Sequence, residues 1–337
     1  MNSFGKFFRV SIYGESHGLS LGVIVDGCPS GIPLEQSDFE HDLTRRKSGA
    51  RGTTPRREDD IPMLKSGVFE GYTTGAPVHI QFENKNTRSR DYTELRKTPR
   101  PGHADFTATA KYGGYEDYRG GGHFSGRLTL GLVAAGTIAK KIIVPSKVES
   151  IIKEVGGKED IQNAVMEALE NQDSIGGIIE CTVNQLPVGL GEPFFDSFES
   201  VMSHMAFSIP AIKGIEFGAG FQAASMKGSE HNDNFITKNG NTETNHAGGI
   251  NGGITNGNPV IFRVAVKPTS STHQSQRTLN FKTGKLTDLQ VEGRHDTCIA
   301  LRVPVVLEAA TAIVTADLML QSHHISRILK PKNDKII

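Results

Sequence analysis

Tryptophan is absent from the 337 residues, and cysteine occurs only three times, at Cys28, Cys181 and Cys298. The cysteines are odd in number, lie far apart in the sequence and include no Cys-x-x-Cys pair. This pattern argues against a disulfide framework and against a zinc site built on paired cysteines. We therefore expect no metal site and a reducing, cytoplasmic location.

An excess of either charge is also missing. Lys and Arg together number 37, Asp and Glu also number 37, and the formal net charge is zero. A protein that coats nucleic acid by bulk electrostatics needs a basic surplus, so we expect no nucleic-acid partner. Any site for anions must therefore be built locally.

Long uninterrupted apolar runs are lacking as well. Lys6 and Arg9 lie among the first apolar residues, and the apolar stretch from Val303 to Leu320 contains Glu308 and Asp317. The core of a signal peptide or of a membrane span would not carry these charges. We expect neither kind of segment.

Glycine, by contrast, is abundant. Its 38 residues cluster at 113–126, around 218 and at 248–257. Because glycine allows sharp turns and close approach of the backbone to other groups, these clusters predict ordered loops. We expect such loops, more than helices, to build the functional site.

The apolar patterns predict both strands and helices. Short alternating segments favour antiparallel strands at 10–13, 19–26 and 78–82. A capping box from Ser37 to Glu40 predicts a helix at about 38–47. Helical spacing predicts further helices after Ser125, at 161–169 and at 305–320.

Two parts of the chain resemble each other. Pro29-Ser30-Gly31-Ile32 and Pro187-Val188-Gly189-Leu190 each follow a predicted strand and precede a helix, the second of them at about 197–206. Similar motifs at 73–78 and 255–260 then open the strand that closes each half. The interval from Pro29 to Pro77 is 48 residues and that from Pro187 to Pro259 is 72, so about 24 extra residues are expected near 229–245.

An internal duplication accounts for this similarity. It predicts an α+β fold in which a helical core is sandwiched between two antiparallel β-sheets related by a pseudo-two-fold axis. We expect one domain over residues 1–325, with repeats at about 5–145 and 146–325. A mobile C-terminal tail is expected at 326–337.

Two motifs suggest other functions. Gly14-Glu15-Ser16-His17-Gly18 fits the G-x-S-x-G turn of serine hydrolases, in which Ser16 would be the nucleophile, but a second strand follows it where a helix is needed. Gly218–Ala223 fits a loose dinucleotide fingerprint without a clear βαβ unit. A non-catalytic binder of a phosphorylated metabolite is the remaining alternative.

A dense group of cations points to anion binding. It falls within thirteen residues at a predicted helix end and in the loop behind it, and comprises Arg45, Arg46, Lys47, Arg51, Arg56 and Arg57. Complementing the helix dipole accounts for two or three cations at such a position. We interpret the remainder as a site for phosphate or carboxylate, which guanidinium groups bind bidentately.

Four polar loops add catalytic groups. Gly120–Arg127 leads into a helix and offers backbone N–H groups to a phosphate. Residues 100–105 and 293–296 each combine arginine and histidine with aspartate, and residues 267–271 join one ammonium to three hydroxyls. Together they predict an enzyme that binds at least two anionic groups and moves protons with histidines and an aspartate.

These segments resemble the chorismate synthase family. Residues 14–18, 120–129 and 293–308 are similar to its three sequence signatures, residues 100–105 and 267–271 also match it, and the resemblance spans about 5–325 in the family's order. It implies a 1,4-elimination of phosphate from 5-enolpyruvylshikimate 3-phosphate to give chorismate. Reduced FMN would be required, although the reaction is redox-neutral overall.

The resemblance also implies roles for individual residues. His17 would protonate the leaving phosphate, His103 would lie near flavin N1, and Asp296 would manage the proton at flavin N5. The anionic substrate would be clamped by Arg46, Arg51, Arg100, Arg127 and Arg294. The flavin would contact His123, Phe124, Ser125, Pro210, Ala211, Gly252, Lys267, Pro268, Thr269, Ser270, Ser271 and Arg294.

Further expectations concern the reductant and the assembly. Any NADPH would meet Arg46 and Arg51, but the sequence offers no separate nicotinamide domain, so we expect dependence on an external reductant. The resemblance also implies a homotetramer. Where many members have Arg-Ser, this chain has His123-Phe124. We expect the cationic contact there to be weaker or replaced.

Overall fold

The computed structural model describes residues 1–56, 58–86, 92, 94–291, 293 and 295–328. The first sheet is antiparallel, in the order β1-β2-β3-β7-β4. Its strands are β1 (Ser3–Phe4), β2 (Arg9–Gly14), β3 (Ser20–Asp26), β4 (Met63–Ser66) and β7 (Val78–Glu83). In β7 the alternate residues Val78, Ile80 and Phe82 are buried, because successive side chains of a strand point to opposite faces. The predicted strands at 10–13, 19–26 and 78–82 are confirmed.

The second sheet has the order β10-β13-β9-β8 and is also antiparallel. It contains β8 (Lys147–Val155), β9 (Gly177–Asn184), β10 (Ile212–Phe217) and β13 (Val260–Val266). Three two-stranded ribbons complete the strands: β5 (Val68–Phe69) with β6 (Tyr72–Thr73), β11 (Ile250–Asn251) with β12 (Ile254–Thr255), and β14 (Gln276–Asn280) with β15 (Lys285–Leu289).

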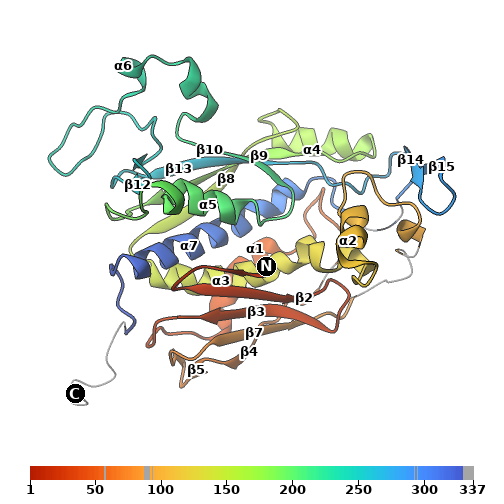
Figure 1. Ribbon diagram of the computed structural model, residues 1–337, viewed down its shortest axis with the longest axis horizontal. Coiled ribbons are helices and arrows are strands. Elements are labelled where there is room, and N and C mark those ends of the chain that lie inside the picture. Colours follow the sequence, from red (N-terminus) through yellow and green to blue (C-terminus); the bar gives the residue numbers. More distant parts are fainter. Residues whose placement is uncertain (57, 87–91, 93, 292, 294, 329–337) are drawn as a thin grey trace.

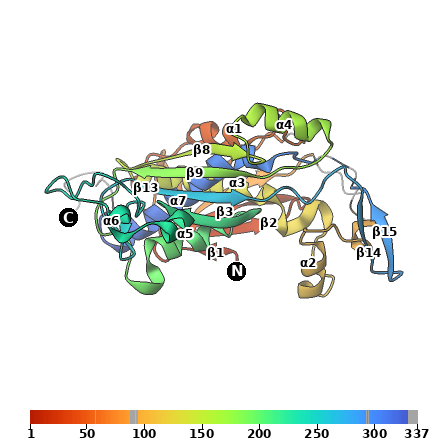
Figure 2. The same cartoon turned by 90° about the horizontal axis from the view of Figure 1, so that it is seen from above.

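Helices fill the space between the two sheets (Figure 1). This layer contains α1 (Glu40–Arg46), α3 (Thr129–Ile142), α5 (Phe198–Ala206) and α7 (Val303–Gln321), and Figure 2 shows β8, β9 and β13 lying over it. Elsewhere lie α2 (Asp105–Tyr112), α4 (Ile161–Glu170) and α6 (Gly228–His231). The 3-10 turns are η1 (Gln36–Phe39), η3 (Glu94–Arg96), η4 (Arg119–Phe124), η5 (Gly126–Leu128), η6 (Phe194–Asp196), η7 (Gly220–Ser225) and η8 (Ile299–Arg302).

The predicted helices are present, but the first begins differently. Asp38 accepts a hydrogen bond from the Glu35 backbone (2.7 Å), so the cap lies at Glu35 and not at Ser37 as predicted. The reason is that the 3-10 turn η1 precedes α1 and moves the start of the helix one turn earlier.

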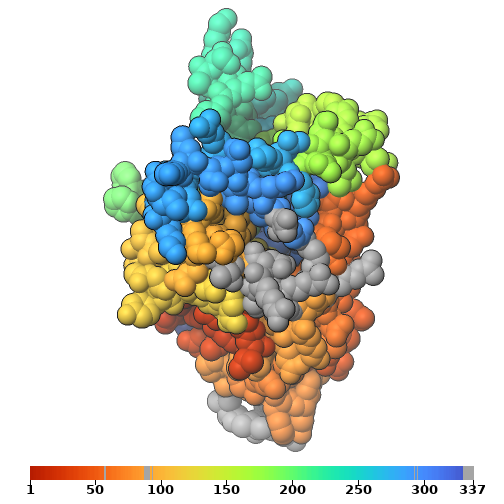
Figure 3. All heavy atoms as spheres, turned by 90° about the vertical axis from the view of Figure 1, so that its right-hand side faces the viewer, coloured from red at the N-terminus to blue at the C-terminus, as the bar shows by residue number. Residues whose placement is uncertain are grey.

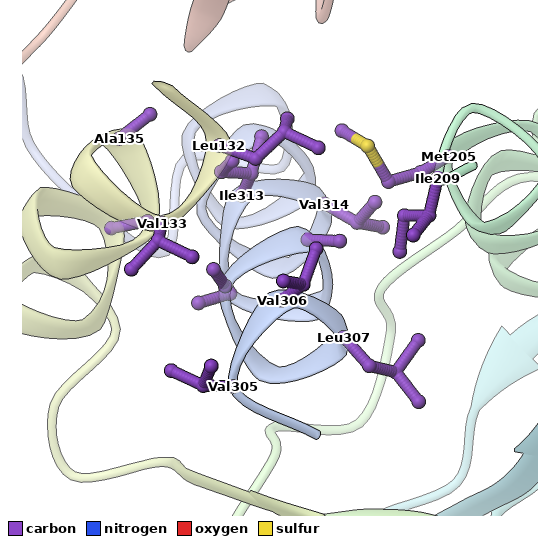
Figure 4. Close-up of a cluster of buried hydrophobic side chains, with 14 of the residues drawn as sticks. Leu132, Val133, Ala135, Met205, Ile209, Val305, Val306, Leu307, Ile313 and Val314 are labelled. Atoms are coloured by element: carbon purple, nitrogen blue, oxygen red, sulfur yellow. The ribbon is translucent and has the colours of Figure 1, made fainter. Parts of the chain in front are cut away.

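The apolar centre of the layer is the contact between α3 and α7 (Figure 4). At Gly136 of α3, an added Cβ would lie 2.3 Å from the Cβ of Ala309, so only glycine permits this close approach. Leu132 and Val133 of α3, with Val306 and Ile313 of α7, belong to the same buried cluster, which extends into both sheets. Burial of this apolar surface is the main force that holds the layers together.

The two charged residues within α7 are explained by their partners. The Glu308 carboxylate accepts two hydrogen bonds from Arg45 (2.6 and 2.7 Å) and one from Lys140. The Asp317 carboxylate accepts hydrogen bonds from the backbone N–H groups of Lys6, Phe7 and Phe8. The segment Ile299–Gln321 is long and apolar enough to cross a membrane, but 94% of its most apolar window is buried inside the protein, which makes it a core helix.

The two sheets share a local hydrogen-bond pattern. The order β2-β3-β7-β4 in the first matches β8-β9-β13-β10 in the second. The Thr73 hydroxyl donates to the Pro29 carbonyl and accepts from the Ile32 backbone, and Thr255 does the same with Pro187 and Leu190. The polar segment predicted at 229–245 lies between β10 and β11 and includes part of α6, which Figure 1 shows projecting from the body.

The chain end is described only as far as residue 328. Ser30 and Ile328 form a parallel bridge, and the Ser30 backbone donates to the Arg327 carbonyl (3.0 Å). The start of the predicted tail therefore lies against the first half of the chain. The rest of the predicted tail, 329–337, lies outside the described residues.

Candidate active site

A cavity of about 1290 Å³ lies where the helical layer meets the loops of both halves. The predicted site residues that line it are Arg46, Arg100, His103, His123, Phe124, Ser125, Arg127, Pro210, Ala211, Lys267, Thr269, Ser270, Ser271 and Asp296. The residues that lead into α3 and α7 also line it, so the positive ends of both helix dipoles open on the cavity. Figure 3 shows the adjoining face, where the blue segment of β14 and β15 lies beside the orange and yellow segment at 94–118.

Five predicted residues are not among those that line the cavity. Pro268 lies between two that do. Arg51 is exposed, whereas its neighbour Gly52 is buried and accepts hydrogen bonds from the backbones of Thr297 and Cys298. Gly252 lies in the β11–β12 ribbon, at the opposite end of α5 from Pro210 and Ala211. Arg294 lies outside the described residues, and His17 is treated next.

His17 lies directly behind the cavity wall. A Cβ added at Gly120, which lines the cavity, would fall 2.6 Å from His17 Nε2, so only a glycine leaves room for the imidazole. The imidazole is 8% exposed and meets the ring of Tyr92 edge-on at 5.3 Å between centroids. The turn between β2 and β3 thus holds His17 against the glycine-rich segment.

His103 belongs to a hydrogen-bonded triad with Asp105 and Arg100. Its Nδ1 donates to Asp105 Oδ1 (2.6 Å), and Arg100 donates from Nε and Nη2 to the same carboxylate (both 2.8 Å). Burial alone would raise the pKa of Asp105, but the hydrogen bonds and charges of Arg100 and His103 lower that pKa well below its usual range. The ionised carboxylate of Asp105 therefore orients the imidazole of His103 through its Nδ1.

Arg100 is held by protein partners. It is 6% exposed, and besides Asp105 it donates to the Ser271 hydroxyl (3.0 Å). Its donors are largely committed to protein partners. Arg100 therefore contributes to the site mainly through its charge and by fixing the loops that carry His103 and Ser271.

Asp296 lies late in the sequence, on the loop before η8, and several hydrogen bonds hold it in place. Its Oδ1 accepts from the Thr54 backbone (3.0 Å), and both carboxylate oxygens lie 3.4 Å from Nη1 of Arg302. Its carbonyl accepts from the Thr269 hydroxyl (2.6 Å). Loops from both halves of the chain thus hold one carboxylate at the cavity.

Arg46 and Arg127 form the deepest cationic part of the wall. Arg46 is 2% exposed and donates to Thr129 and to the carbonyls of Gly126 and Arg127. Burial lowers the pKa of Arg46 to about 9, and the charges of Arg302 and Arg127 act in the same direction, whereas Asp60 raises it. Arg46 therefore stays charged at neutral pH but has few donors to spare.

Arg127 retains one unused donor. Its Nε donates to Asn84 (3.1 Å) and its Nη1 to Asp60 (2.6 Å). Its Nη2 is buried and has no hydrogen-bond partner among the described residues. Since buried donors are almost always paired in folded proteins, this nitrogen marks a position for a ligand oxygen.

A polar strip lines the part of the cavity that belongs to the second half of the chain. Lys267 donates to the Ser270 hydroxyl (2.9 Å), which donates to the Gly102 carbonyl (2.6 Å). The Lys267 backbone donates to the carbonyl of Ala211, a residue with a φ of 76°. Burial lowers the pKa of Lys267, and the charge of Lys213 acts in the same direction. The strip offers one ammonium and several hydroxyls to a phosphate.

The His123-Phe124 pair occupies the wall between these groups. Both ring nitrogens of His123 have partners within the protein: Nδ1 lies 2.8 Å from the Gly14 carbonyl oxygen and Nε2 lies 2.9 Å from Asn2 Oδ1. Phe124 is 40% exposed at the cavity and lies 6.3 Å from the Tyr112 ring. An aromatic surface thus stands where a polar residue was expected from other members.

Many cavity residues were missed as site residues, and three charged ones illustrate why. The sequence could have indicated Arg56, because it belongs to the basic group at 45–57. In the structure, Arg56 donates to the Ser16 hydroxyl (3.1 Å). Arg302 lies within the third signature. Asp60 had no signal, because its partners Arg46 and Arg127 are remote in sequence and meet it only in the fold.

The two alternative motifs lack the structural context that they need. The turn at 14–18 joins β2 to β3 in an antiparallel hairpin, whereas a nucleophile elbow joins a strand to a helix. Gly218–Ala223 follows β10 into the 3-10 turn η7, and β10 belongs to an antiparallel sheet, not to a βαβ unit. Neither motif supports a hydrolase or a dinucleotide fold.

Comparison with known proteins agrees with the motifs. The profile of chorismate synthase matches residues 8–320. This chain belongs to the chorismate synthase family. The chorismate synthase of Chitinophaga pinensis is 64% identical over 331 residues, covering 98% of this chain and 100% of the relative. One from Dehalococcoides mccartyi is 46% identical over 361 residues, covering 98% and 99%.

A solved structure shows the same fold. A crystal structure of chorismate synthase matches with a TM-score of 0.72 at 25% identity, over 95% of this chain and 93% of that chain. The chorismate synthase resemblance expected from the motifs is confirmed, as is the assignment to the lyases of the shikimate pathway. The expected antiparallel sheets are confirmed as well.

The unused donor of Arg127 predicts a role in binding. Arg127→Ala should raise the dissociation constant of the anionic substrate by a factor of about 10 to 100, since a charged hydrogen bond contributes roughly 1.5 to 3 kcal/mol. Calorimetric titration without turnover measures this constant. Arg277→Ala, which removes an exposed arginine of β14, is the matched control. An unchanged constant in Arg127→Ala would remove this residue from the clamp.

Proposed function

We propose that this chain converts 5-enolpyruvylshikimate 3-phosphate to chorismate by 1,4-elimination of phosphate, with reduced FMN bound beside the substrate. The observation that carries the proposal is the cationic cavity. Among the described residues, seven Lys and Arg line it against four Asp and Glu, in a chain with no net charge. A substrate with one phosphate and two carboxylates suits such a surplus.

The substrate anions would be met in two ways. Arg127 offers Nη2 directly, and Arg56 and Lys47 add cations from the loop and the end of α1. Arg46 and Arg100, whose donors are largely engaged, would attract the substrate by their positive charge and not by bidentate hydrogen bonds. Arg51 would complete the proposed clamp from an adjacent loop, and Arg294, which lies outside the described residues, is proposed for the clamp on the family resemblance alone. Arg46 and Arg51 are the groups toward which NADPH would lie.

The residues present fit a flavin mononucleotide. A site for one drug-sized ligand measures roughly 300 to 1,000 Å³, so a cavity of about 1290 Å³ has room for substrate and flavin together. Lys267, Thr269, Ser270 and Ser271 would hold the phosphate side of the flavin, and Pro210, Ala211 and Phe124 would line its apolar surface. When bound, reduced FMN supplies the electron-rich partner that the elimination requires.

The remaining proposed flavin contacts are less direct. His123 and Ser125 lie on the glycine-rich wall, and Pro268 lies within the polar strip. Arg294 would add a cation. Gly252 is retained only as a proposed contact from the far end of α5, since this chain does not bring it to its own cavity.

Protons would be handled by three groups. His17, held behind Gly120, would protonate the leaving phosphate. His103, oriented by Asp105, would stabilise negative charge near flavin N1. Asp296, held by Thr54 and Arg302, would accept and return the proton near flavin N5.

We also propose an internal duplication, a cellular location and an oligomeric state for this chain. The matched sheet orders and the matched threonine bonds support an internal duplication with a pseudo-two-fold axis, in one domain over 1–325 with repeats at about 5–145 and 146–325. The absence of paired cysteines supports a cytoplasmic setting. We also propose a homotetramer, as in the family, and an external reductant in place of intrinsic NADPH-dependent flavin reduction.

The reaction can be tested directly with the purified chain. Under anaerobic conditions, phosphate should be released from 5-enolpyruvylshikimate 3-phosphate only when chemically reduced FMN is present. Oxidised FMN is the control, because it occupies the same site without the reducing electrons. Release of phosphate without reduced FMN, or no release in either condition, would refute the proposed reaction.

The two histidines predict a loss of turnover with little loss of binding. His17→Ala and His103→Ala should each lower kcat by roughly 10²-fold or more, while the dissociation constant of the substrate changes little. His41→Ala, which removes an exposed histidine of α1, should keep the wild-type rate. Near-normal turnover in both site variants would overturn their assignment as proton donors.

A further inference from the structure

We propose that Asp60 sets the affinity of the cavity for inorganic phosphate, by partly neutralising the two arginines that face the leaving group. The proposal rests on the proposed function in one respect, that phosphate is the group released. In this account Asp60 is a positioning residue that keeps phosphate from remaining bound after the C–O bond breaks.

The carboxylate of Asp60 bridges two buried arginines. Its Oδ1 lies 2.6 Å from Nη1 of Arg127, and its Oδ2 lies 3.6 Å from Nη1 of Arg46. The three side chains are 3%, 8% and 2% exposed, respectively. Water therefore screens these charges poorly, and each affects the others strongly.

The arginines crowd one another on this wall. Burial lowers the pKa of Arg46 most, and the charges of Arg302 and Arg127 lower it further, which shows that all three cations lie within range. Asp60 and Asp296 act in the opposite direction. A buried charge without a counter-ion is strongly unfavourable, so Asp60 makes the ligand-free cavity tolerable.

The same carboxylate opposes a bound anion. Nη2 of Arg127, the donor left for a ligand oxygen, belongs to the guanidinium group whose Nη1 binds Asp60. A phosphate at Nη2 therefore lies close to a negative carboxylate in a poorly screened region. The cavity can attract a substrate with three anionic groups through its other cations, yet hold free phosphate only moderately.

The backbone at Asp60 permits a clean substitution. Its φ is 53°, in the left-handed region, where Asp and Asn are the most tolerated residues after glycine. Asp60→Asn therefore removes the charge and keeps both the shape and the conformation. Asp59→Asn is the matched control, because Asp59 lines the same cavity but forms no ion pair among the described residues.

The test is the dissociation constant of inorganic phosphate, measured by calorimetry at fixed pH and ionic strength. Asp60→Asn should bind phosphate about tenfold more tightly than the wild type, whereas Asp59→Asn should change the constant less than about threefold. Unchanged or weaker binding in Asp60→Asn would overturn the proposal. An equal gain in Asp59→Asn would also overturn it, because the effect would then be one of general charge.

A second measurement, the unfolding temperature, keeps the proposal testable if Asp60→Asn is poorly folded. If Asp60→Asn is destabilised in phosphate-free buffer, added phosphate should raise its unfolding temperature more than that of the wild type. A variant that stays unfolded in saturating phosphate would overturn the proposal. Since no turnover is involved, the two proposals can fail separately. A wild-type chain without lyase activity would refute the proposed reaction, and with it the role of Asp60 in product release, but not the effect of Asp60 on phosphate affinity.

Discussion

Burial of several guanidinium groups around one cavity is the constraint on which the rest of the site depends. Arg46, Arg100 and Arg127 are each less than a tenth exposed, and each is held by hydrogen bonds to carbonyls, hydroxyls or carboxylates. Burying such cations is strongly unfavourable unless enough acceptors surround them. Much of the loop structure near the cavity supplies those acceptors, which is why this site is built from many short segments.

The fold brings these segments together through its helical layer. The close contact of α3 and α7 places the starts of both helices at one end, and the loops before them carry Arg127 and Asp296. The two sheets enclose the layer and add His17 from the first half and Lys267 from the second. The cavity therefore lies between the two halves of the chain, and residues from both halves are needed to form it.

Prediction from sequence succeeded where a pattern is local. Alternation predicted β2, β3 and β7, helical spacing predicted α3 and α7, and the order of five motifs predicted the family. The paired motifs also located Thr73 and Thr255, whose matching hydrogen bonds no single pattern could have shown. The helix cap at Ser37 was wrong because a 3-10 turn came first.

Prediction fell short where the fold decides. Asp60 pairs with arginines 14 and 67 positions away, and nothing near it in sequence indicates them. Arg100 stays a proposed substrate contact, and the sequence did not indicate its hydrogen bonds to Asp105 and Ser271, the second of which is 171 residues away. Gly252 stays a proposed flavin contact, and in the fold it lies at the opposite end of α5 from Pro210 and Ala211.

The central claim is that one cavity holds substrate and flavin at the same time. The most direct test is the dissociation constant of oxidised FMN, measured by fluorescence titration at increasing concentrations of 5-enolpyruvylshikimate 3-phosphate. Simultaneous binding predicts that this constant stays the same or falls as substrate is added. A constant that rises in proportion to the substrate concentration would show competition for a single site and contradict the account.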